Sequence, residues 1–290
     1  MPIIRSLYGP VVVCRRIVLL CNDDLTTNLI FAPLLLDKQV TVVGIFFASA
    51  PFEGESSTIK AAFKLLRRMD WRYWLYLVFT NCCYLVFKNR WRRTLVGEQG
   101  AVPLRSLRAL AKDKQIPVKV VSDFSSTYFE SQLREMKVDV LAIRIGSILT
   151  KRVLDIPKEC TICVHSSLLP SFKGIAGEFH ALRTKQAPIG STIFRVSPLL
   201  DAGPPLAYVQ IERDEHQSVF SHMIRNNTAA GRLMLDLLNM HSVLEPATKL
   251  KLPESYFSWP TRAHMTGFRK QGLRLITASE TFALMRSAFF

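Results

Sequence analysis

Cysteine is sparse in this chain of 290 residues. The six cysteines have neither the density nor the spacing of a disulfide framework, which excludes a disulfide-stapled scaffold and makes a reducing compartment, the cytoplasm, the expected location. Cys160 and Cys163 form a CxxC pair, but no second pair accompanies them. In the strand-like run CTICVH, residues three apart point to opposite faces, so we predict no metal site.

Acidic residues, and charged residues in general, are also few. The chain has 23 Asp and Glu against 38 Lys and Arg, a net charge of +15. With 49% hydrophobic and 21% charged residues it is not a disordered tail, and its length allows one large domain or a domain with an appendage. The positive excess favours a nucleic acid, an anionic membrane surface or a phosphorylated substrate, without choosing among them.

No internal repeat is visible, but strand-like apolar runs alternate with helical periodicity. Near-continuous apolar strands between helices indicate a parallel sheet covered on both faces. We therefore predict an α/β fold with a doubly wound, mostly parallel sheet and a hairpin-like tail. The expected strands are 16–21, 40–49, 117–124, 138–145 and 160–165, with two more within 190–213. The expected helices are 22–36, 56–69, 126–137, 150–157, 175–186 and 215–240.

The pattern divides the chain into two parts. Residues 1–240 are predicted to form the α/β domain, and residues 241–290, with prolines, basic residues and scattered aromatics, a short C-terminal appendage. The first twenty residues are basic and apolar enough to suggest a targeting peptide. Because residues 16–21 fit the first strand of the sheet, we expect no cleaved signal.

An insertion at about residues 64–93 interrupts the α/β rhythm. Residues 73–87 carry no charge, whereas residues 60–93 hold nine Lys and Arg against Asp70 alone. Fifteen residues make a helix of about 22 Å, short of the ~30 Å hydrocarbon layer. We interpret the block as a membrane-surface helix, with aromatic rings at headgroup level and arginines on anionic lipid. The rings are Trp71, Tyr73, Trp74, Tyr76 and Trp91. A buried insertion and a nucleic-acid surface are the alternatives.

The stretch VHSSLLPSFKG (164–174) places a histidine where a strand ends and a loop begins. In open parallel sheets, ligands bind outside the carboxyl ends of the strands. Asp201, in LLDAGPPL, also lies in a loop that leaves a strand. A carboxylate beside His165 would orient the imidazole for acid–base work. Alternatively, His165 is a structural histidine, and the residues after it form a strand-to-loop connection in which two leucines pack into the core.

The run from Val138 to Gln210 resembles the folate-dependent formyltransferases, which include methionyl-tRNA, glycinamide ribonucleotide and amino-sugar formyltransferases. The family signature looks like Asn-x-His-x-Ser-Leu-Leu-Pro, then Gly after a short loop, then Asp-x-Gly-Pro. This chain reads Cys163-Val164-His165-Ser166-Ser167-Leu168-Leu169-Pro170, then Gly174, then Asp201-Ala202-Gly203-Pro204. The resemblance implies a Rossmann-like formyltransferase fold. It also implies transfer of a formyl group from 10-formyltetrahydrofolate, as co-substrate, to an amine.

The resemblance assigns roles to these residues. Protonated His165 would stabilise the oxyanion that develops on the formyl oxygen, while Asp201 orients the imidazole and assists proton removal through water. Two groups of residues are implied in folate binding. Ser167, Leu168, Leu169 and Pro170 would lie against the folate, and Ile145, Gly146, Ser147, Ile148 and Leu149 would form part of the pterin pocket.

Cys163 departs from the signature, because it stands where the family has an asparagine that donates to the oxyanion. A thiol is a weak donor, and losing one such donor costs roughly 10²- to 10³-fold in rate. Another donor substitutes for it, or the enzyme is slow, or the chain is a catalytically impaired, membrane-associated folate-binding protein. A nucleophilic Cys163 beside His165 is a further alternative.

The acceptor is left open by the sequence. Glycinamide ribonucleotide members look to have a glycine-rich phosphate loop after the first strand, but this chain has NDDLTTN (22–28) there. Methionyl-tRNA formyltransferase carries a sizeable RNA-binding C-terminal domain, for which fifty residues hardly suffice, although the positive charge would suit tRNA. An amino sugar or a lipid-linked amine near a membrane is the other acceptor class. Hydrolysis of formyltetrahydrofolate is an alternative reaction.

Overall fold

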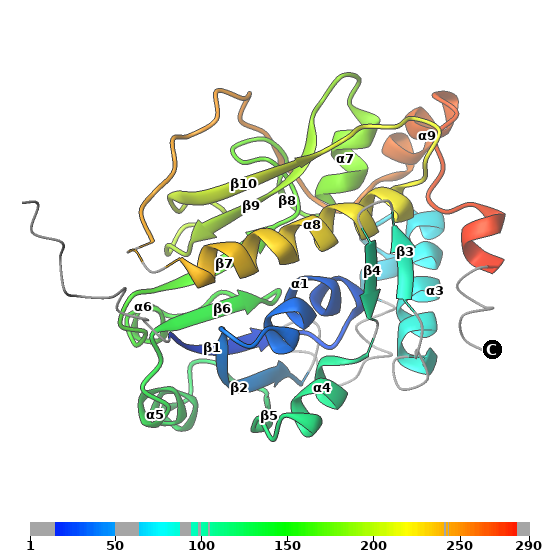
Figure 1. The fold of residues 1–290 in the computed structure, drawn as a ribbon. Helices are drawn as coiled ribbons and strands as arrows, with labels where there is room; N and C mark the ends of the chain where they lie inside the picture. Colours follow the sequence, from blue (N-terminus) through cyan, green and yellow to red (C-terminus); the bar gives the residue numbers. More distant parts are fainter. Residues whose placement is uncertain are drawn as a thin grey trace, which may run out of the picture.

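A computed structural model of the chain describes residues 15–49, 64–87, 94–97, 100–103, 105–240, 242 and 244–282. Its centre is a seven-stranded sheet of order β10-β9-β7-β6-β1-β2-β5 (Figure 1). Five neighbouring strands are parallel: β1 (Arg16–Cys21), β2 (Thr41–Ala48), β5 (Val118–Val121), β6 (Val140–Arg144) and β7 (Cys160–His165). The hairpin of β9 (Ile189–Arg195) and β10 (Pro205–Ile211) adds antiparallel to β7. The predicted fold class is confirmed.

The winding of the sheet reverses between β1 and β6. From β1 the chain proceeds outward to β2 and β5, then returns to the other side of β1 to form β6 and β7. At the carboxyl ends of the two strands, the Asn22 N–H donates to the Arg144 carbonyl at 3.1 Å. Open α/β sheets bind ligands at such a switch point, so this edge is where a site is expected.

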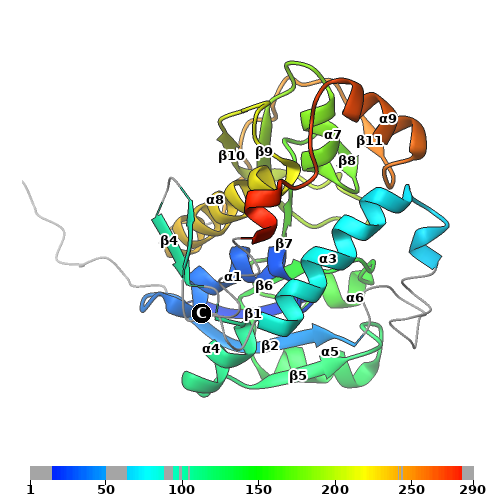
Figure 2. The same cartoon turned by 90° about the vertical axis from the view of Figure 1, so that its right-hand side faces the viewer.

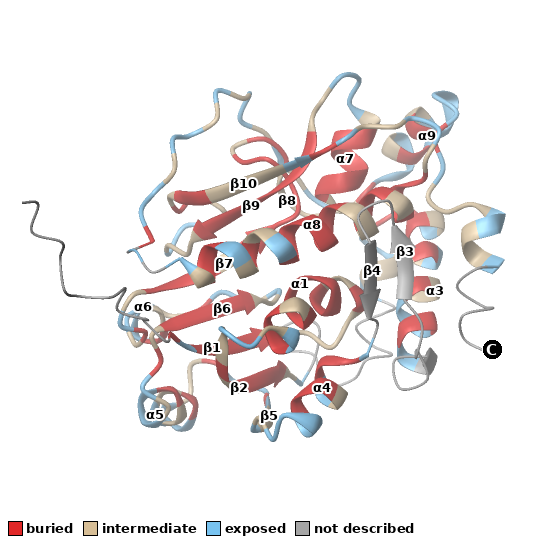
Figure 3. Ribbon diagram, in the orientation of Figure 1, coloured by how far each residue is buried: buried red, intermediate tan, exposed pale blue. Residues whose placement is uncertain are grey.

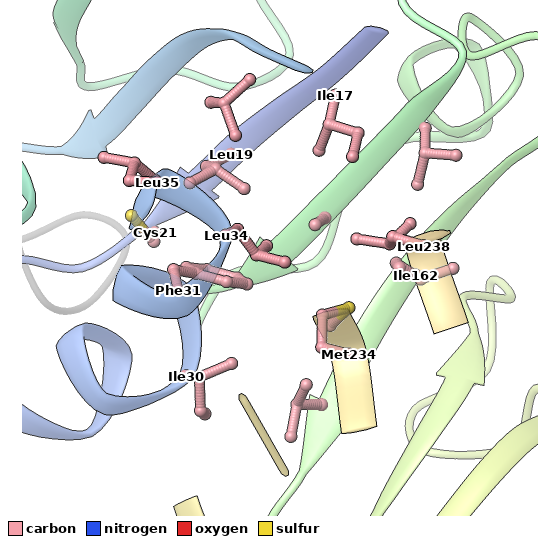
Figure 4. Packing of buried hydrophobic residues seen from close by; sticks show 14 of the residues in the cluster. Ile17, Leu19, Cys21, Ile30, Phe31, Leu34, Leu35, Ile162, Met234 and Leu238 are labelled. Atoms are coloured by element: carbon pink, nitrogen blue, oxygen red, sulfur yellow. The ribbon is translucent and has the colours of Figure 1, made fainter. Parts of the chain in front are cut away.

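Helices cover both faces of the sheet, because the apolar strand residues alternate between two cores. On one face lie α1 (Leu25–Leu36), α4 (Leu107–Asp113) and α8 (Val219–Asn239). Figure 4 shows side chains of α1 and α8 packed against those of β1 and β7. On the other lie α5 (Thr127–Glu135) and α6 (Lys151–Leu154). The inner strands β1, β6, β7 and β9 are buried almost throughout, whereas the edge strands β5 and β10 are largely half-buried or exposed (Figure 3). Helix α4 was not predicted.

Helices α1 and α8 approach each other closely, and the sequence contains the reason. Pro33 has no N–H, so the carbonyl of Leu29 loses its donor within α1. Gly231 of α8 packs against that point: a Cβ there would lie 2.6 Å from the Leu29 carbonyl oxygen. A side chain at residue 231 would therefore push α8 away from the core.

The insertion forms a helix across the carboxyl edge of the sheet, α3 (Trp71–Phe87), and a hairpin of β3 (Thr94–Gly97) and β4 (Gly100–Pro103) (Figure 2). Tyr73 and Tyr76 are buried against α7 (Gly177–Arg183), α8 and the C-terminal segment. The expectation that both rings lie at headgroup level was therefore wrong, because this face of α3 is needed to complete a core. No described helix is long and apolar enough to cross a bilayer.

The outer face of α3 carries exposed apolar side chains. Trp71, Leu75 and Leu85 are respectively 59%, 47% and 53% exposed. Three parts of the sequence interpretation lie outside the described residues. They are the targeting-peptide region up to residue 14, most of the helix expected at 56–69, and the basic flank 88–93 with Trp91.

The C-terminal segment packs onto the α/β core. Strand β11 (Tyr256–Phe257) pairs in parallel with β8 (Lys173–Gly174), and α9 (Arg262–Lys270) buries Met265 and Phe268 in the cluster that α3, α7 and α8 share. The predicted boundary after residue 240 falls at the C-cap of α8, Met240. Beyond that boundary the segment returns to the loop that follows β7.

Candidate active site

His165 is the last residue of β7, and its ring is held between two acceptors. Nε2 lies 3.0 Å from the carbonyl oxygen of Phe172, which can only accept, so Nε2 carries a proton. Nδ1 lies 3.7 Å from Oδ1 of Asp201, too far for a direct hydrogen bond but close enough for a shared water. The structure thus brings the predicted pair together and adds Phe172, which sequence reasoning did not find.

Asp201 is held by its backbone conformation and by a donor from the loop after β7. Its Oδ2 accepts a hydrogen bond from the Gly174 N–H at 2.9 Å. Asp201, Phe172 and Ala176 all have left-handed backbones, with φ of 48°, 55° and 57°. Such conformations are costly for residues other than glycine, and they concentrate where surrounding contacts demand a particular geometry. Two of them, Phe172 and Asp201, contact the His165 imidazole, which indicates a preorganised site.

Residues Ser167 to Pro170, predicted to contact folate, lie mostly inside the fold. The Ser167 hydroxyl donates to the carbonyls of Ser171 and Phe172, at 2.8 and 3.1 Å. Leu168 and Leu169 are buried, and Pro170, half-buried, follows a cis peptide bond. These side chains shape the loop whose carbonyl fixes His165.

The segment from Ile145 to Leu149 follows β6 and differs in character. Leu149 is buried in the core against α5 and α6, whereas Gly146 is exposed and Ile148 is 69% exposed. No hydrogen bond among the described residues engages the main chain of Gly146, Ser147 or Ile148. Peptide groups without a hydrogen-bond partner among the described residues thus lie beside an exposed aliphatic side chain.

Cys163 is half-buried on the strand that ends at His165. Burial raises the pKa of its thiol to about 12, and the carboxylate of Asp201 adds to the rise, while Arg144 opposes it. The thiol is therefore protonated at neutral pH and is a poor nucleophile. Its Sγ lies 3.6 Å from the carbonyl oxygen of Val164. Cys160, three residues earlier, packs into the opposite core, as expected for a strand.

The C-terminal segment fixes the loop after β7, a contact that the sequence did not signal. The N–H of Lys173 donates to the Ser255 carbonyl at 2.8 Å, and the N–H of Phe172 donates to the Ser255 hydroxyl at 2.9 Å. Gly174 has a φ of +93°, and a Cβ there would lie 2.3 Å from the carbonyl oxygen of Phe257. A two-residue bridge has no periodicity to detect in a sequence.

A buried polar network lies behind His165, and it too was missed. The Arg144 guanidinium donates to the Val164 carbonyl at 3.0 Å and to the Ser166 hydroxyl at 3.1 Å. The Ser166 hydroxyl donates to the Asn227 amide, which donates to the Glu178 carboxylate, each at 3.1 Å. Within the described ranges, no group of three or more His, Cys, Asp or Glu side chains could hold a metal ion.

His180 of α7 makes the site region sensitive to acid. Burial lowers the pKa of His180 to about 4, from 6.5. The unfolded state therefore binds more protons between these values, and the stabilisation present above pH 6.5 is lost as the pH falls towards 4. We expect a loss of about 3 kcal/mol from this residue, measured by urea unfolding at pH 7 and at pH 4. His180→Gln should flatten this dependence and His216→Gln, at an exposed position, should not; equal slopes would contradict the assignment.

Comparison with known proteins identifies the kind of protein that has this fold and site. Residues 106–238 match the family described as formyl transferase. A methionyl-tRNA formyltransferase from Mycobacterium sp. (strain KMS) is 32% identical over 142 residues, 49% of this chain and 42% of that protein. A second, from Magnetococcus marinus, is 30% identical over 177 residues, 57% of each chain.

Solved structures with the same fold include two formyltransferases. The phosphoribosylglycinamide formyltransferase from Anaplasma phagocytophilum is 18% identical, with a TM-score of 0.51 over 78% of this chain and 87% of that one. A sugar N-formyltransferase from Shewanella sp. is 12% identical, with a TM-score of 0.50 over 94% of this chain and 87% of that one.

Residues 106–238 of the chain, a little under half of its length, match the formyltransferase family, whose signature the residues around His165 resemble. The chain spans about half the length of the curated relatives that it matches.

Proposed function

We propose that this chain transfers a formyl group from 10-formyltetrahydrofolate to an amine. The observation that carries the proposal is the pairing of His165 Nδ1 with Asp201 Oδ1, 3.7 Å apart, at the carboxyl end of β7 in a formyltransferase-family domain. The two atoms are within ion-pair distance, so the carboxylate is suited to stabilise a positive charge on the imidazole. The exposed residues Gly146 and Ile148 of the segment after β6 support binding of the pterin end of the donor there.

In this reaction the amine attacks the formyl carbon, and the electron pair of the C–O double bond moves onto the oxygen. The tetrahedral adduct then collapses, the bond to N10 of tetrahydrofolate breaks, and the proton that leaves the amine ends on N10. The Phe172 carbonyl fixes the proton on Nε2 of His165, so Nδ1 is the ring atom that takes and returns a proton. Asp201 stabilises the imidazolium when it forms.

The start of α1 argues against an acceptor whose phosphate binds there. The Asp24 carboxylate already caps this helix, accepting from the Thr27 N–H at 2.8 Å. The neighbouring Asp23 carboxylate accepts from the Tyr84 hydroxyl at 3.1 Å. Asp23 is also ion-paired with Arg108 at 3.0 Å. The carboxylate of Asp24 already occupies the helix N-terminus where a phosphate would bind. We therefore favour methionyl-tRNA, an amino sugar or a lipid-linked amine over glycinamide ribonucleotide.

The test is turnover of 10-formyltetrahydrofolate to tetrahydrofolate with each of four acceptors: methionyl-tRNA, amino sugars, glycinamide ribonucleotide and water. Turnover that depends on one of the amines supports the proposal and identifies the acceptor class. Formate release without an amine would instead indicate a formyltetrahydrofolate hydrolase. Tetrahydrofolate binding without turnover under any condition would indicate a catalytically impaired folate-binding protein.

We further propose that the outer face of α3 brings the protein to an anionic membrane surface from the cytoplasm. Trp71, Leu75 and Leu85 are exposed there, with Arg67 and Arg68 exposed just before the helix. The wild type should float with vesicles that contain anionic lipid, and Leu75→Glu with Leu85→Glu should reduce flotation at least several-fold. Tyr128→Glu, an exposed position on α5, is the matched control. A wild type that stays at the bottom contradicts the proposal.

A further inference from the structure

A chain of hydrogen bonds links helix α8 to the residue that follows His165. The Asn227 amide nitrogen donates to Oε1 of Glu178 at 3.1 Å, and the Asn227 amide oxygen accepts from the Ser166 hydroxyl, also at 3.1 Å. The Ser166 hydroxyl in turn accepts from the Arg144 guanidinium at 3.1 Å. The chain therefore joins a carboxylate to a guanidinium through the residue next to the imidazole.

Every donor in this chain points the same way, from Arg144 towards Glu178. Carboxylate and carbonyl oxygens only accept, so Asn227 directs its amide nitrogen at Glu178 and at the Met223 carbonyl, 2.7 Å away. The amide oxygen then faces Ser166, which donates its single hydroxyl proton there. Hydrogen bonds aligned head to tail between opposite charges strengthen one another. The arrangement of the chain is therefore unique.

The members of the chain are held inside the protein. Asn227 is fully buried, and Ser166 and Glu178 are each 8% exposed. A buried polar group that loses its partner is costly, so each member holds the next in place. Helix α7 packs on the same point, because a Cβ at Gly177 would lie 2.4 Å from the Ser166 carbonyl oxygen. Ser166 thus has little freedom to move.

The chain acts on the strand end from behind the imidazole. Side chains alternate along a strand, so Val164 packs in the core beneath α1 and α8, whereas the His165 ring points to the other face, towards Asp201. Arg144 donates to the Val164 carbonyl at 3.0 Å as well as to Ser166. The residues on both sides of His165 are therefore anchored on the face opposite the ring.

We propose that Asn227 is a positioning residue for the transfer reaction. Through Ser166 it holds the end of β7, so that the His165 imidazole stays between the Phe172 carbonyl and the Asp201 carboxylate. This inference rests on the proposed function. A displacement of about 1 Å in a reacting group can cost about 10²-fold in rate, so a strand end that is no longer anchored lowers kcat.

The neighbouring residue of α8 provides a matched comparison. Asn226 is also fully buried, and its amide nitrogen also donates to Oε1 of Glu178, at 3.2 Å. Its amide oxygen, however, accepts from the Ser191 hydroxyl on β9 at 2.9 Å. Two adjacent asparagines thus share the same carboxylate and the same burial, but Asn227 is the one bonded to Ser166.

The experiment compares Asn227→Ala and Ser166→Ala with Asn226→Ala in steady-state formyl transfer, using the acceptor that the turnover assay identifies. The first two variants should lower kcat about 10- to 10²-fold and leave KM for 10-formyltetrahydrofolate within about threefold. Asn226→Ala should lose a similar amount of stability in urea unfolding but keep its kcat. The double variant Asn227→Ala with Ser166→Ala should be no slower than either single variant, because both break the same link.

A second measurement follows the imidazole without turnover. Isotope-labelled histidine allows NMR to measure how fast the Nε2 proton of His165 exchanges with water, with His165→Gln to assign the signal. Exchange should be at least about tenfold faster in Asn227→Ala and Ser166→Ala than in Asn226→Ala. Equal exchange rates, an equal loss of kcat in the two asparagine variants, or additive losses in the double variant would overturn the inference. A wild type without turnover would overturn the proposed function, while the exchange rates still decide whether Asn227 positions the imidazole.

Discussion

Replacing His165 with alanine is expected to lower kcat for formyl transfer about 10²- to 10⁴-fold. The imidazole is the group with a nitrogen free to exchange a proton next to Asp201, because the Phe172 carbonyl occupies the other nitrogen. No other described imidazole lies beside Asp201 to replace it. The measurement is steady-state turnover of 10-formyltetrahydrofolate with the acceptor identified above.

The control for this variant is His216→Ala, since His216 is exposed on the loop before α8. It should keep wild-type turnover. Affinity for tetrahydrofolate, measured by calorimetry, should be similar in both variants, because the ring is assigned to proton transfer and not to folate binding. Turnover by His165→Ala within a factor of three of the wild type would remove the histidine from the mechanism.

Replacing Gly174 with alanine is expected to cost about 2–4 kcal/mol in the free energy of unfolding and to abolish most of the activity. A Cβ at this position would lie 2.3 Å from the Phe257 carbonyl oxygen, in a backbone conformation with φ of +93°. Relief of the clash requires β8 and β11 to separate. Asp201 then loses the Gly174 N–H, and the loop that fixes His165 loses its support.

Gly272→Ala is the matched control for the contact between residue 174 and the Phe257 carbonyl. Gly272 also has a positive φ, +77°, but a Cβ there would meet nothing within 4 Å. Its alanine variant should cost about 1 kcal/mol through the backbone conformation alone and should keep its activity. Urea unfolding and turnover, measured on both variants, separate the two effects. Equal losses in the two variants would show that the β8–β11 contact does not position the site.

The structure of the insertion could be predicted only in part from the sequence. The uncharged run and its basic flank predict one membrane-surface helix, and a helix is present there as α3. The run does not reveal which side of that helix is occupied, because nearly every residue in it is apolar or aromatic. Burial of Tyr73 and Tyr76 was decided by the cluster of α7, α8 and the C-terminal segment. The side chains of Trp71 and Leu75 stay exposed on the other face of α3, where a partner can contact them.

The parallel strands and the position of His165 at the end of β7 followed from the sequence alone. Apolar periodicity is a local property, and a buried strand in a parallel sheet has a recognisable one. The residues that hold the imidazole and its strand end in place could not be predicted from this periodicity. Phe172 reaches His165 through a left-handed loop, and Arg144, on the neighbouring strand, reaches the residues on either side of His165. Ser255 arrives from more than eighty residues away along the chain.

The sequence by itself thus determined which segments form the sheet and which histidine and aspartate are candidates for chemistry. Only the tertiary structure decided that a carbonyl fixes the proton on Nε2, that Arg144 donates to the residues on either side of His165, and that the C-terminal segment supports the site loop. The physical reason is that each of these contacts joins side chains or single peptide groups from distant segments. Their meeting depends on how the whole chain packs and leaves no periodic trace in any one segment.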